Sequence, residues 1–212
     1  MWILLSSRSA QIDDLPSAMT PESPALPEQM AARRHLPCDH AAMTSHAFPS
    51  DVNCRLLRMS DAPAFCGVLR RFFKHARNDW PGDDAFDAFF ARQCDEARDA
   101  GRDAPGPLRF LGAFERAGDG EEGGLLGVIS LALVPSTYQF RPFVYCDDLY
   151  VTPDARGRAV GRALIDAAEQ LGRPWGASTL MLGVGMDDAD ARAFYERVGL
   201  RPMGNELFYL SL

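Results

Sequence analysis

The chain has 212 residues, 47% of them hydrophobic, and a formal net charge of −7. This size and apolar content fit one domain, with or without a tail, and the negative charge argues against a dedicated nucleic-acid binder. The sequence has no apolar run near the ~18 residues of a membrane span, and residues 2–5 are too short an apolar run for a signal peptide. The five cysteines include no Cys-x-x-Cys pair, which indicates free thiols. We therefore expect a cytoplasmic protein without disulfides, a metal site or a membrane partner.

Residues 1–50 differ in composition from the remainder of the chain. Proline interrupts them every few residues, and Ala, Ser, Glu and Met lie between the prolines with no sustained period. Such a composition cannot bury enough apolar surface to offset the entropy of ordering. We predict a disordered tail over 1–50, which is either dispensable or a regulatory or targeting arm, and a folded domain over 51–212.

A strand and two helices open the predicted domain. The strand covers 53–59, and the run Ser-Asp-Ala-Pro at 60–63 has the capping residue and the early proline of a helix start. Apolar residues at helical spacing extend this helix to about Ala76. After a loop at 78–84, a second helix with an aromatic face ends at Gly101.

Three strands form the centre of the predicted sheet, over 109–115, 125–134 and 144–151. The middle strand is nearly all apolar, as expected for a strand buried on both faces. A helix, a short strand, a helix that starts at 187 or 188 and a terminal strand complete the order β-α-α-β-β-β-α-β-α-β. These last four elements are predicted to end at residues 171, 184, 198 and 212.

The turn at 156–161 has the composition of a phosphate-binding site. It reads Arg-Gly-Arg-Ala-Val-Gly between a strand and an amphipathic helix, and its small residues let the backbone approach a ligand. The first amides of a helix lack internal partners and lie at the positive end of the helix dipole, so they bind phosphate groups well. Arg156, Arg158 and Arg162 add positive charge. The turn lacks the Lys-Ser or Lys-Thr of a P-loop and the three-glycine spacing of a dinucleotide-binding loop.

This turn and its flanks resemble the pyrophosphate loop of the GNAT superfamily, the acetyl-CoA-dependent N-acetyltransferases. The family pattern Val-x-Pro-x-x-Arg-Gly-x-Gly-Ile-Gly-x-x-Leu starts here at Val151, but Ala159 stands where the family has Gly. Because φ is negative at a helix start, we expect Ala159 to be tolerated. The resemblance implies a mixed α/β sheet with helices on both faces, whose strands 144–151 and 179–184 splay apart to admit acetyl-CoA. It implies that acetyl-CoA is bound by Leu149, Tyr150, Val151, Arg156, Gly157, Arg158, Ala159, Val160, Gly161 and Arg162.

A second motif lies on the predicted helix that starts near residue 188. It reads Asp-x-x-Ala-x-x-Phe-Tyr-x-x-x-Gly-Leu and is similar to the family's Asn-x-x-Ala-x-x-Phe-Tyr-x-x-x-Gly-Phe. Asp188 can still cap the helix, but it lacks the amide donor that Asn would offer to CoA. The resemblance implies that Tyr195 protonates the departing CoA thiolate or donates a hydrogen bond to it, with Phe194 beside the cofactor. The alternative is that both rings only pack the helix.

Two acids precede the end of the strand at 144–151. Neighbouring residues of a strand face opposite sides, so we expect at most one of Asp147 and Asp148 to point fully into the cleft unless a bulge redirects the other. The run from Tyr145 to Val151 is similar to the Glu-Asp-Leu-Tyr-Val run of small-amine acetyltransferases. That resemblance implies that Asp147 is the base or the anchor of the amine.

The same resemblance implies contacts with the acceptor. In the family, the region between the first two helices walls the acceptor site, and here it carries Trp80 with three carboxylates; a solvated loop is the alternative. The loop before residue 144 is also similar to the small-amine subgroup, which implies that Tyr138 contacts the acceptor.

These features predict an acetyl-CoA-dependent N-acetyltransferase without a metal. The acceptor is expected to be a primary amine of a polyamine, diamine or amino-acid-like compound, attacked directly in a ternary complex. A cysteine beside two carboxylates is a poor nucleophile, which argues against an acyl-enzyme at Cys146. Acetylation of a protein N-terminus or lysine and a non-catalytic acyl-CoA sensor stay open, as does a homodimer.

Overall fold

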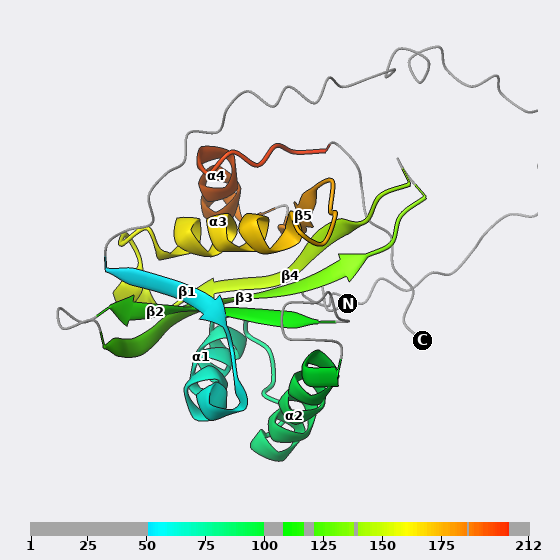
Figure 1. The fold of residues 1–212 in the computed structure, drawn as a ribbon. Helices are drawn as coiled ribbons and strands as arrows, with labels where there is room; N and C mark the ends of the chain where they lie inside the picture. Colours follow the sequence, from blue (N-terminus) through cyan, green and yellow to red (C-terminus); the bar gives the residue numbers. More distant parts are fainter. Residues whose placement is uncertain (1–50, 100–107, 117–120, 138–139, 186, 204–212) are drawn as a thin grey trace, which may run out of the picture. The chain divides into compact units, whose positions relative to one another are not determined.

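A computed structural model describes residues 51–99, 108–116, 121–137, 140–185 and 187–203 of the chain (Figure 1). The predicted tail at 1–50, the predicted strand at 206–212 and Tyr138 lie outside these residues. Within them, the predicted order of strands and helices is confirmed from the first strand to the last helix.

The described residues form five strands in one mixed sheet, in the chain order β1-β2-β3-β4-β5. Neighbouring strands are antiparallel except β4 and β5, which run parallel. A parallel pair needs a crossover, and helix α3 supplies it. The strands are β1 (Val52–Leu56), β2 (Arg109–Arg116), β3 (Glu122–Val134), β4 (Phe143–Val151) and β5 (Leu180–Leu182).

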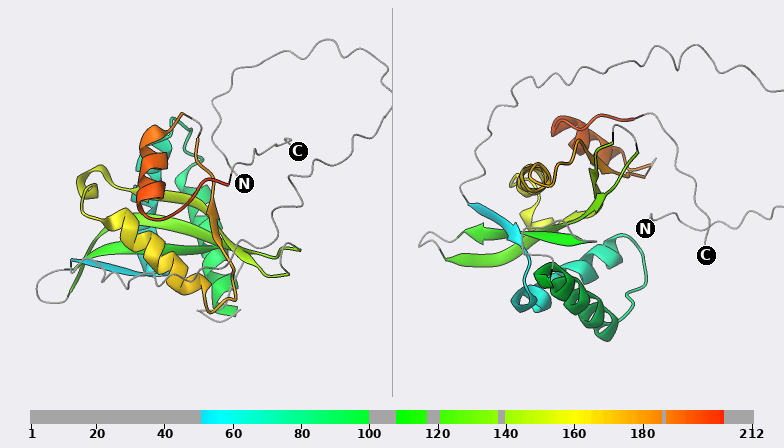
Figure 2. Two further views of the ribbon diagram at one scale, coloured as in Figure 1. Left: turned by 90° about the horizontal axis from the view of Figure 1, so that it is seen from above. Right: turned by 45° about the vertical axis from the view of Figure 1, so that its right-hand side comes forward.

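Helices cover both faces of this sheet, as the sequence predicts. One face carries α1 and α2, and the other carries α3 with α4 on the same side (Figures 1 and 2). None of the described helices is long and apolar enough to cross a membrane. The helices are α1 (Ala62–His75), α2 (Asp83–Asp99), α3 (Val160–Gly172) and α4 (Ala189–Arg197).

The central strand β3 separates two hydrophobic cores, because successive side chains of a strand alternate between its faces. Ile129 and Leu131 pack with Leu164 of α3, whereas Val128 packs on the other face with Phe65 of α1. Burial of each such side chain contributes about 1.5–3 kcal/mol. A polar residue inside this strand therefore requires a specific partner.

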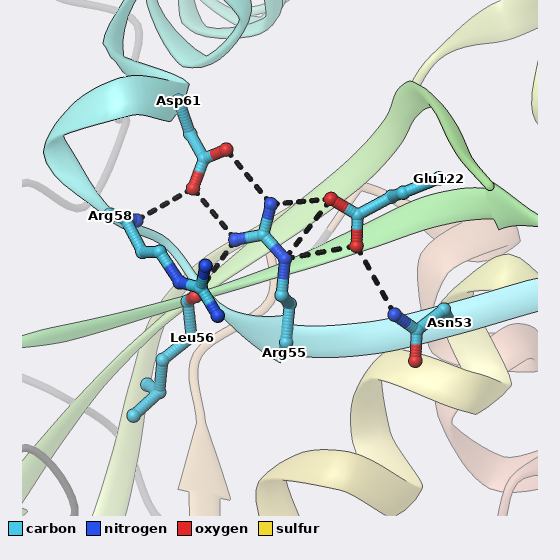
Figure 3. A network of polar contacts seen from close by, with 6 residues as sticks. All are labelled: Asn53, Arg55, Leu56, Arg58, Asp61 and Glu122. Carbon is cyan, nitrogen blue, oxygen red and sulfur yellow. Dashed lines mark hydrogen bonds and ion pairs between the residues drawn. The ribbon is translucent and has the colours of Figure 1, made fainter.

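The guanidinium of Arg55 ties β1 to the start of α1 and to β3 (Figure 3). Its Nη1 and Nη2 lie 2.7 and 2.9 Å from the carboxylate of Asp61, Nη2 lies 2.5 Å from Oε1 of Glu122, and its Cζ lies 4.1 Å above the ring of Phe114. Asp61 is the N-cap residue of α1, but its side chain does not cap the helix. Its carboxylate instead accepts from Arg55 and from the backbone N–H of Arg58 at 2.6 Å.

Candidate active site

Strand β5 pairs with only the first part of β4 and leaves a gap in the sheet beside the last residues of β4. Their pairing runs from Val144 opposite Leu180 to Cys146 opposite Leu182, whereas β4 continues to Val151. The described residues place no strand against this last part of β4 on that side. This open edge of β4 lies where the sequence predicts the two strands to splay apart.

The peptide groups of β4 that face this gap can be identified from their neighbours. Asp148 N donates to Ser130 Oγ, and Thr152 N donates to a carbonyl of β3, both at 2.9 Å. Successive amides of a strand point to opposite edges. The N–H groups of Leu149 and Val151 therefore point into the gap.

A β-bulge interrupts the pairing of β3 with β4. Ile129 pairs with Leu149 and Leu131 pairs with Cys146, so two steps along β3 correspond to three steps along β4. All four side chains pack in the core on the α3 side. The residues between them, one on β3 and two on β4, consequently lie toward the face that carries α1 and α2.

Those three residues are Ser130, Asp147 and Asp148. Regular alternation would place the two acids on opposite faces, so the bulge brings together two carboxylates that the sequence pattern alone would separate. The sequence predicts at most one acid in the cleft unless a bulge redirects the other, and such a bulge is present. Both acids are half-buried, and Ser130 is 5% exposed.

The protein environment makes both acids easier to protonate. Burial raises the pKa of Asp148 to about 6, helped by the negative charge of Asp147, while a hydrogen bond from Ser130 acts in the opposite direction. Burial also raises the pKa of Asp147. A carboxylate with a pKa nearer neutrality can accept and release a proton under physiological conditions.

Tyr195 lies on α4 as a half-buried, neutral phenol. Burial is the main cause that raises its pKa, and the charges of Cys146, Asp188 and Asp148 act in the same direction. Because the charge of Asp148 acts on the phenol, Tyr195 lies within electrostatic range of the acid pair. The carboxylate of Asp188 accepts the N–H of Ala191 at 2.9 Å, which confirms that Asp188 caps the helix.

Gly161 joins the two sequence motifs. A Cβ at Gly161 would lie 2.9 Å from the ring of Phe194, closer than real Cβ contacts allow. Glycine is therefore needed for the ring of Phe194 to pack against the start of α3. The ring of Tyr195 lies 5.3 Å from that of Phe194, so this contact also positions the phenol.

The loop before α3 contradicts one expectation. A short 3-10 turn at Pro153–Ala155 is followed by Gly157 with φ of +80° and Ala159 with φ of +57°. Ala159 is thus left-handed, and the expected negative φ is wrong because the helix begins only at Val160 and Ala159 is its N-cap. A non-glycine residue in this conformation costs about 1–2 kcal/mol. Val160 is buried in the core and anchors the loop.

The loop also carries less unpaired positive charge than its sequence suggests. Arg158 lies 2.8 Å from the carboxylate of Glu115, and Arg162 lies 2.8 Å from that of Asp166. Arg156 is exposed, and its Nε lies 3.4 Å from the carbonyl of Val151. Because two of the three arginines are paired with acids, anion binding here would rest on the first amides of α3 and on Arg156.

The side chain of Trp80 contacts residues of the neighbouring helices α1 and α2. Its indole N–H donates to Asp83 at 2.9 Å, and its ring meets that of Phe73 edge-on with the centroids 5.2 Å apart. The adjacent Phe72 lies 5.6 Å from the ring of Tyr150 on β4. These rings form a continuous aromatic layer from the α1–α2 loop to β4. The side chain of Tyr150 is thus part of the core, and the gap beside it is bordered by backbone.

Sequence reasoning missed two residues that lie toward the same face as the acids. Ser130 stands out as the one polar residue in the apolar run at 125–134, which was a readable signal. Tyr145 precedes Asp147 by two positions, so simple alternation would have placed them on one face. Burial raises the pKa of Tyr145, and the charge of Asp147 adds to this effect.

Comparison with protein families gives one match. The sequence model of the acetyltransferase (GNAT) family matches residues 69–200, which is more than half of the chain. The matched segment contains the acid pair, the loop before α3 and Tyr195. No curated protein sequence matches the chain.

Solved structures with a similar fold include a ribosomal-protein-alanine N-acetyltransferase from Brucella melitensis biovar Abortus 2308. It is 22% identical, with a TM-score of 0.58 over 78% of this chain and 100% of that one. An aminoglycoside acetyltransferase from an uncultured soil metagenomic sample, in complex with sisomicin, is 16% identical, with a TM-score of 0.58 over 76% and 96%. The structure of AAC(6')-Iy with the bisubstrate analogue CoA-S-monomethyl-acetylneamine is 18% identical, with a TM-score of 0.59 over 77% and 99%. At these identities the likeness establishes the fold.

Proposed function

The chain belongs to the GNAT family of acetyltransferases, and on that premise we propose that it transfers the acetyl group of acetyl-CoA to a primary amine of a small cationic molecule. The observation that carries the proposal is the pair Asp147 and Asp148, which lie toward one face of β4 beside the gap between β4 and β5. Carboxylates attract an ammonium group, and a partly buried carboxylate can accept the proton that the amine must lose. Polyamines, diamines and amino-acid-like amines fit this chemistry.

Acetyl-CoA is the co-substrate of the family, and the open part of β4 fits it. The N–H groups of Leu149 and Val151 suit the amides of the pantetheine arm, which would add to β4 as a strand does. The first amides of α3 and the exposed Arg156 suit the pyrophosphate. Phe194 and Asp188 belong to the helix that packs on this loop, so they would border the same ligand.

The reaction follows from the position of the acids and the phenol. The amine nitrogen attacks the thioester carbonyl, so the C–N bond forms while the C–S bond breaks and CoA leaves as a thiolate. Asp148 accepts a proton from the amine, directly or through water, and Asp147 holds the positive charge of the acceptor. Tyr195 donates a hydrogen bond to the departing thiolate and stabilises its charge, because its raised pKa keeps the phenol protonated, and the thiolate takes up its proton from solvent.

Two choices among these residues have specific causes. We assign the role of base to Asp148, because burial raises its pKa to about 6 and Ser130 holds its backbone N–H at the bulge. Cys146 is excluded as an acyl-enzyme nucleophile, since it is buried and its thiol pKa is raised by that burial and by both acids. Direct attack in a ternary complex is therefore favoured.

Two other activities are alternatives to this proposal, and a cellular location accompanies it. Acid pairs also suit a protein N-terminus or lysine, and one similar structure is a ribosomal-protein-alanine N-acetyltransferase. A non-catalytic acyl-CoA sensor is favoured by the left-handed Ala159, which strains the loop expected to hold CoA. We also propose a cytoplasmic location, in keeping with the free thiols of Cys54, Cys66, Cys94 and Cys146.

Release of free CoA from acetyl-CoA, followed with a panel of amines, tests the proposal. We expect diamines and polyamines to be acetylated with higher kcat/KM than neutral amines or a peptide with a free N-terminus. Acetylation of the peptide alone would establish the protein-acceptor activity instead. Binding of acetyl-CoA in calorimetry without turnover of any amine would establish the sensor.

The variant Tyr195→Phe tests the role of the phenol at the departing thiolate. Loss of the phenol hydroxyl removes the hydrogen bond to the thiolate and should lower kcat about 10²-fold while binding of acetyl-CoA stays the same. Turnover equal to that of the parent protein would remove Tyr195 from the mechanism.

A further inference from the structure

Ser130 is a polar side chain in the buried middle of the central strand β3. Its neighbours Ile129 and Leu131 are 0% exposed, and Ser130 itself is 5% exposed. A buried hydroxyl costs free energy unless it is hydrogen-bonded. The partner of Ser130 is therefore informative about what the strand positions.

That partner is Asp148. The backbone N–H of Asp148 donates to Ser130 Oγ at 2.9 Å, at the bulge where Ser130 lies opposite the two acids. The hydroxyl accepts this bond and still has its own proton to donate. A hydrogen bond between Ser130 and the Asp148 carboxylate holds the pKa of that acid below the value that burial alone would give.

We infer that Ser130 is a positioning residue for the transfer reaction, whose hydroxyl holds the backbone of Asp148 in the bulge and favours the charged, proton-accepting form of its carboxylate. This inference rests on the function proposed above and adds the group that prepares the base. A hydroxyl that bonds to a carboxylate favours the ionised form, whereas an alanine at this position would leave the carboxylate buried without that bond.

Other titratable groups lie near Asp148, and their titrations must be distinguished from that of the Asp148 carboxyl. On β4, Asp147, Cys146 and Tyr145 are close enough for their charges to interact with that of Asp148. On α4, Tyr195 interacts with Asp148 as well. His75 of α1 lies further along, with its ring 6.1 Å from that of Tyr150. A measurement that reports on the Asp148 carboxyl itself is therefore needed.

The experiment is an NMR titration of the Asp148 carboxyl carbon in the full chain, compared among Ser130→Ala, Ser130→Thr and the parent. We expect the midpoint in Ser130→Ala to rise by about one pH unit, and the acid limb of kcat/KM to move with it. The rate on that limb would then fall about tenfold. Ser130→Thr keeps the hydroxyl and should titrate like the parent.

Val128→Ala is the matched control, because Val128 lies on the same face of β3, two residues from Ser130, and packs in the aromatic core. It should lower stability without moving the titration of Asp148. An unchanged Asp148 titration in Ser130→Ala, or an equal movement in Val128→Ala, would overturn the inference whatever the protein acetylates. A moved titration with an unmoved acid limb would support the role of Ser130 and overturn the role of Asp148 as base.

Discussion

The acid pair of β4 and the loop before α3 are close in sequence but depend on different kinds of group. The acids are half-buried side chains on a strand, and a bulge sets their direction. The loop presents backbone amides, and two of its three arginines are paired with carboxylates. In the function proposed above, the acids form the acceptor half of the site and the loop forms the CoA half. Side-chain chemistry should therefore matter most in the acceptor half, and backbone shape in the CoA half.

Among these predictions, removal of the Asp148 carboxylate should have the largest effect on activity. Asp148→Asn is expected to lower kcat/KM for the amine about 10²–10⁴-fold, because the amide cannot accept a proton. Asp147→Asn is the matched control one residue away, and it should act mainly through a higher KM for the amine. Steady-state kinetics of both variants would reject this division of roles if Asp147→Asn lost more kcat than Asp148→Asn.

A substitution outside both halves of the proposed site serves as a reference for an effect on stability alone. Arg55→Ala should lower the free energy of unfolding by about 2 kcal/mol, between the values for exposed and buried ion pairs, and leave both KM values unchanged. Urea unfolding with parallel kinetics measures this effect. A raised KM for acetyl-CoA would show that the position of β1 affects the site.

The Arg55 contacts also set a dependence on pH. Hydrogen bonds from Arg55 are the main cause that lowers the pKa values of Asp61 and Glu122. Their contribution to stability is present above the unfolded carboxyl pKa of about 4 and is lost as the pH falls through the lower folded values. Arg55→Ala should therefore show a smaller loss of stability on acidification than the parent.

Two glycines of α3 allow an effect on the proposed site to be compared with an effect on stability alone. A Cβ at Gly161 would lie 2.9 Å from Phe194, and a Cβ at Gly172 would lie 2.8 Å from Val144. Both alanine variants should lose about 1 kcal/mol of stability through overpacking. We expect only Gly161→Ala to raise the KM for acetyl-CoA, because it displaces α4 from the loop. Equal KM values in the two variants would contradict that.

The smallest effect concerns the left-handed N-cap. Ala159→Gly should raise the free energy of unfolding by about 0.5 kcal/mol, because relief of the positive φ exceeds the entropy that glycine loses on folding. Binding of acetyl-CoA should not weaken. Ala193→Gly, on the exposed side of α4, is the control and should lose about 1 kcal/mol. Destabilisation of both variants in thermal unfolding would argue against strain at Ala159.

Local patterns in the sequence predicted most of the fold. The helical spacing of apolar residues and the apolar run of β3 are properties of neighbouring residues, and they located the elements closely. The cap at Asp188 was predicted for the same reason. The contact between Asp61 and Arg55 could not be predicted in this way, because Arg55 comes from another element.

The site was predicted less completely, because parts of it depend on distant residues. Arg158 pairs with Glu115 and with Asp51, which is 107 residues away, and no local pattern reveals such partners. The bulge depends on how β4 pairs with β3, so its position could not be read from β4 alone. Ala159 occupies the left-handed N-cap directly before the first helical residue, and a one-residue difference in that boundary reversed the expected sign of φ.

The bulge adds one residue to β4 between Cys146 and Leu149, and this extra residue is why two carboxylates lie opposite Ser130. If one residue were absent between Cys146 and Leu149, both of these side chains would still point to the α3 core and β4 would alternate regularly. One acid would then remain opposite Ser130. A strand with two carboxylates opposite Ser130 and a strand with one thus differ, in this scaffold, by a single codon, and the insertion or deletion of that codon leaves both hydrophobic cores in register.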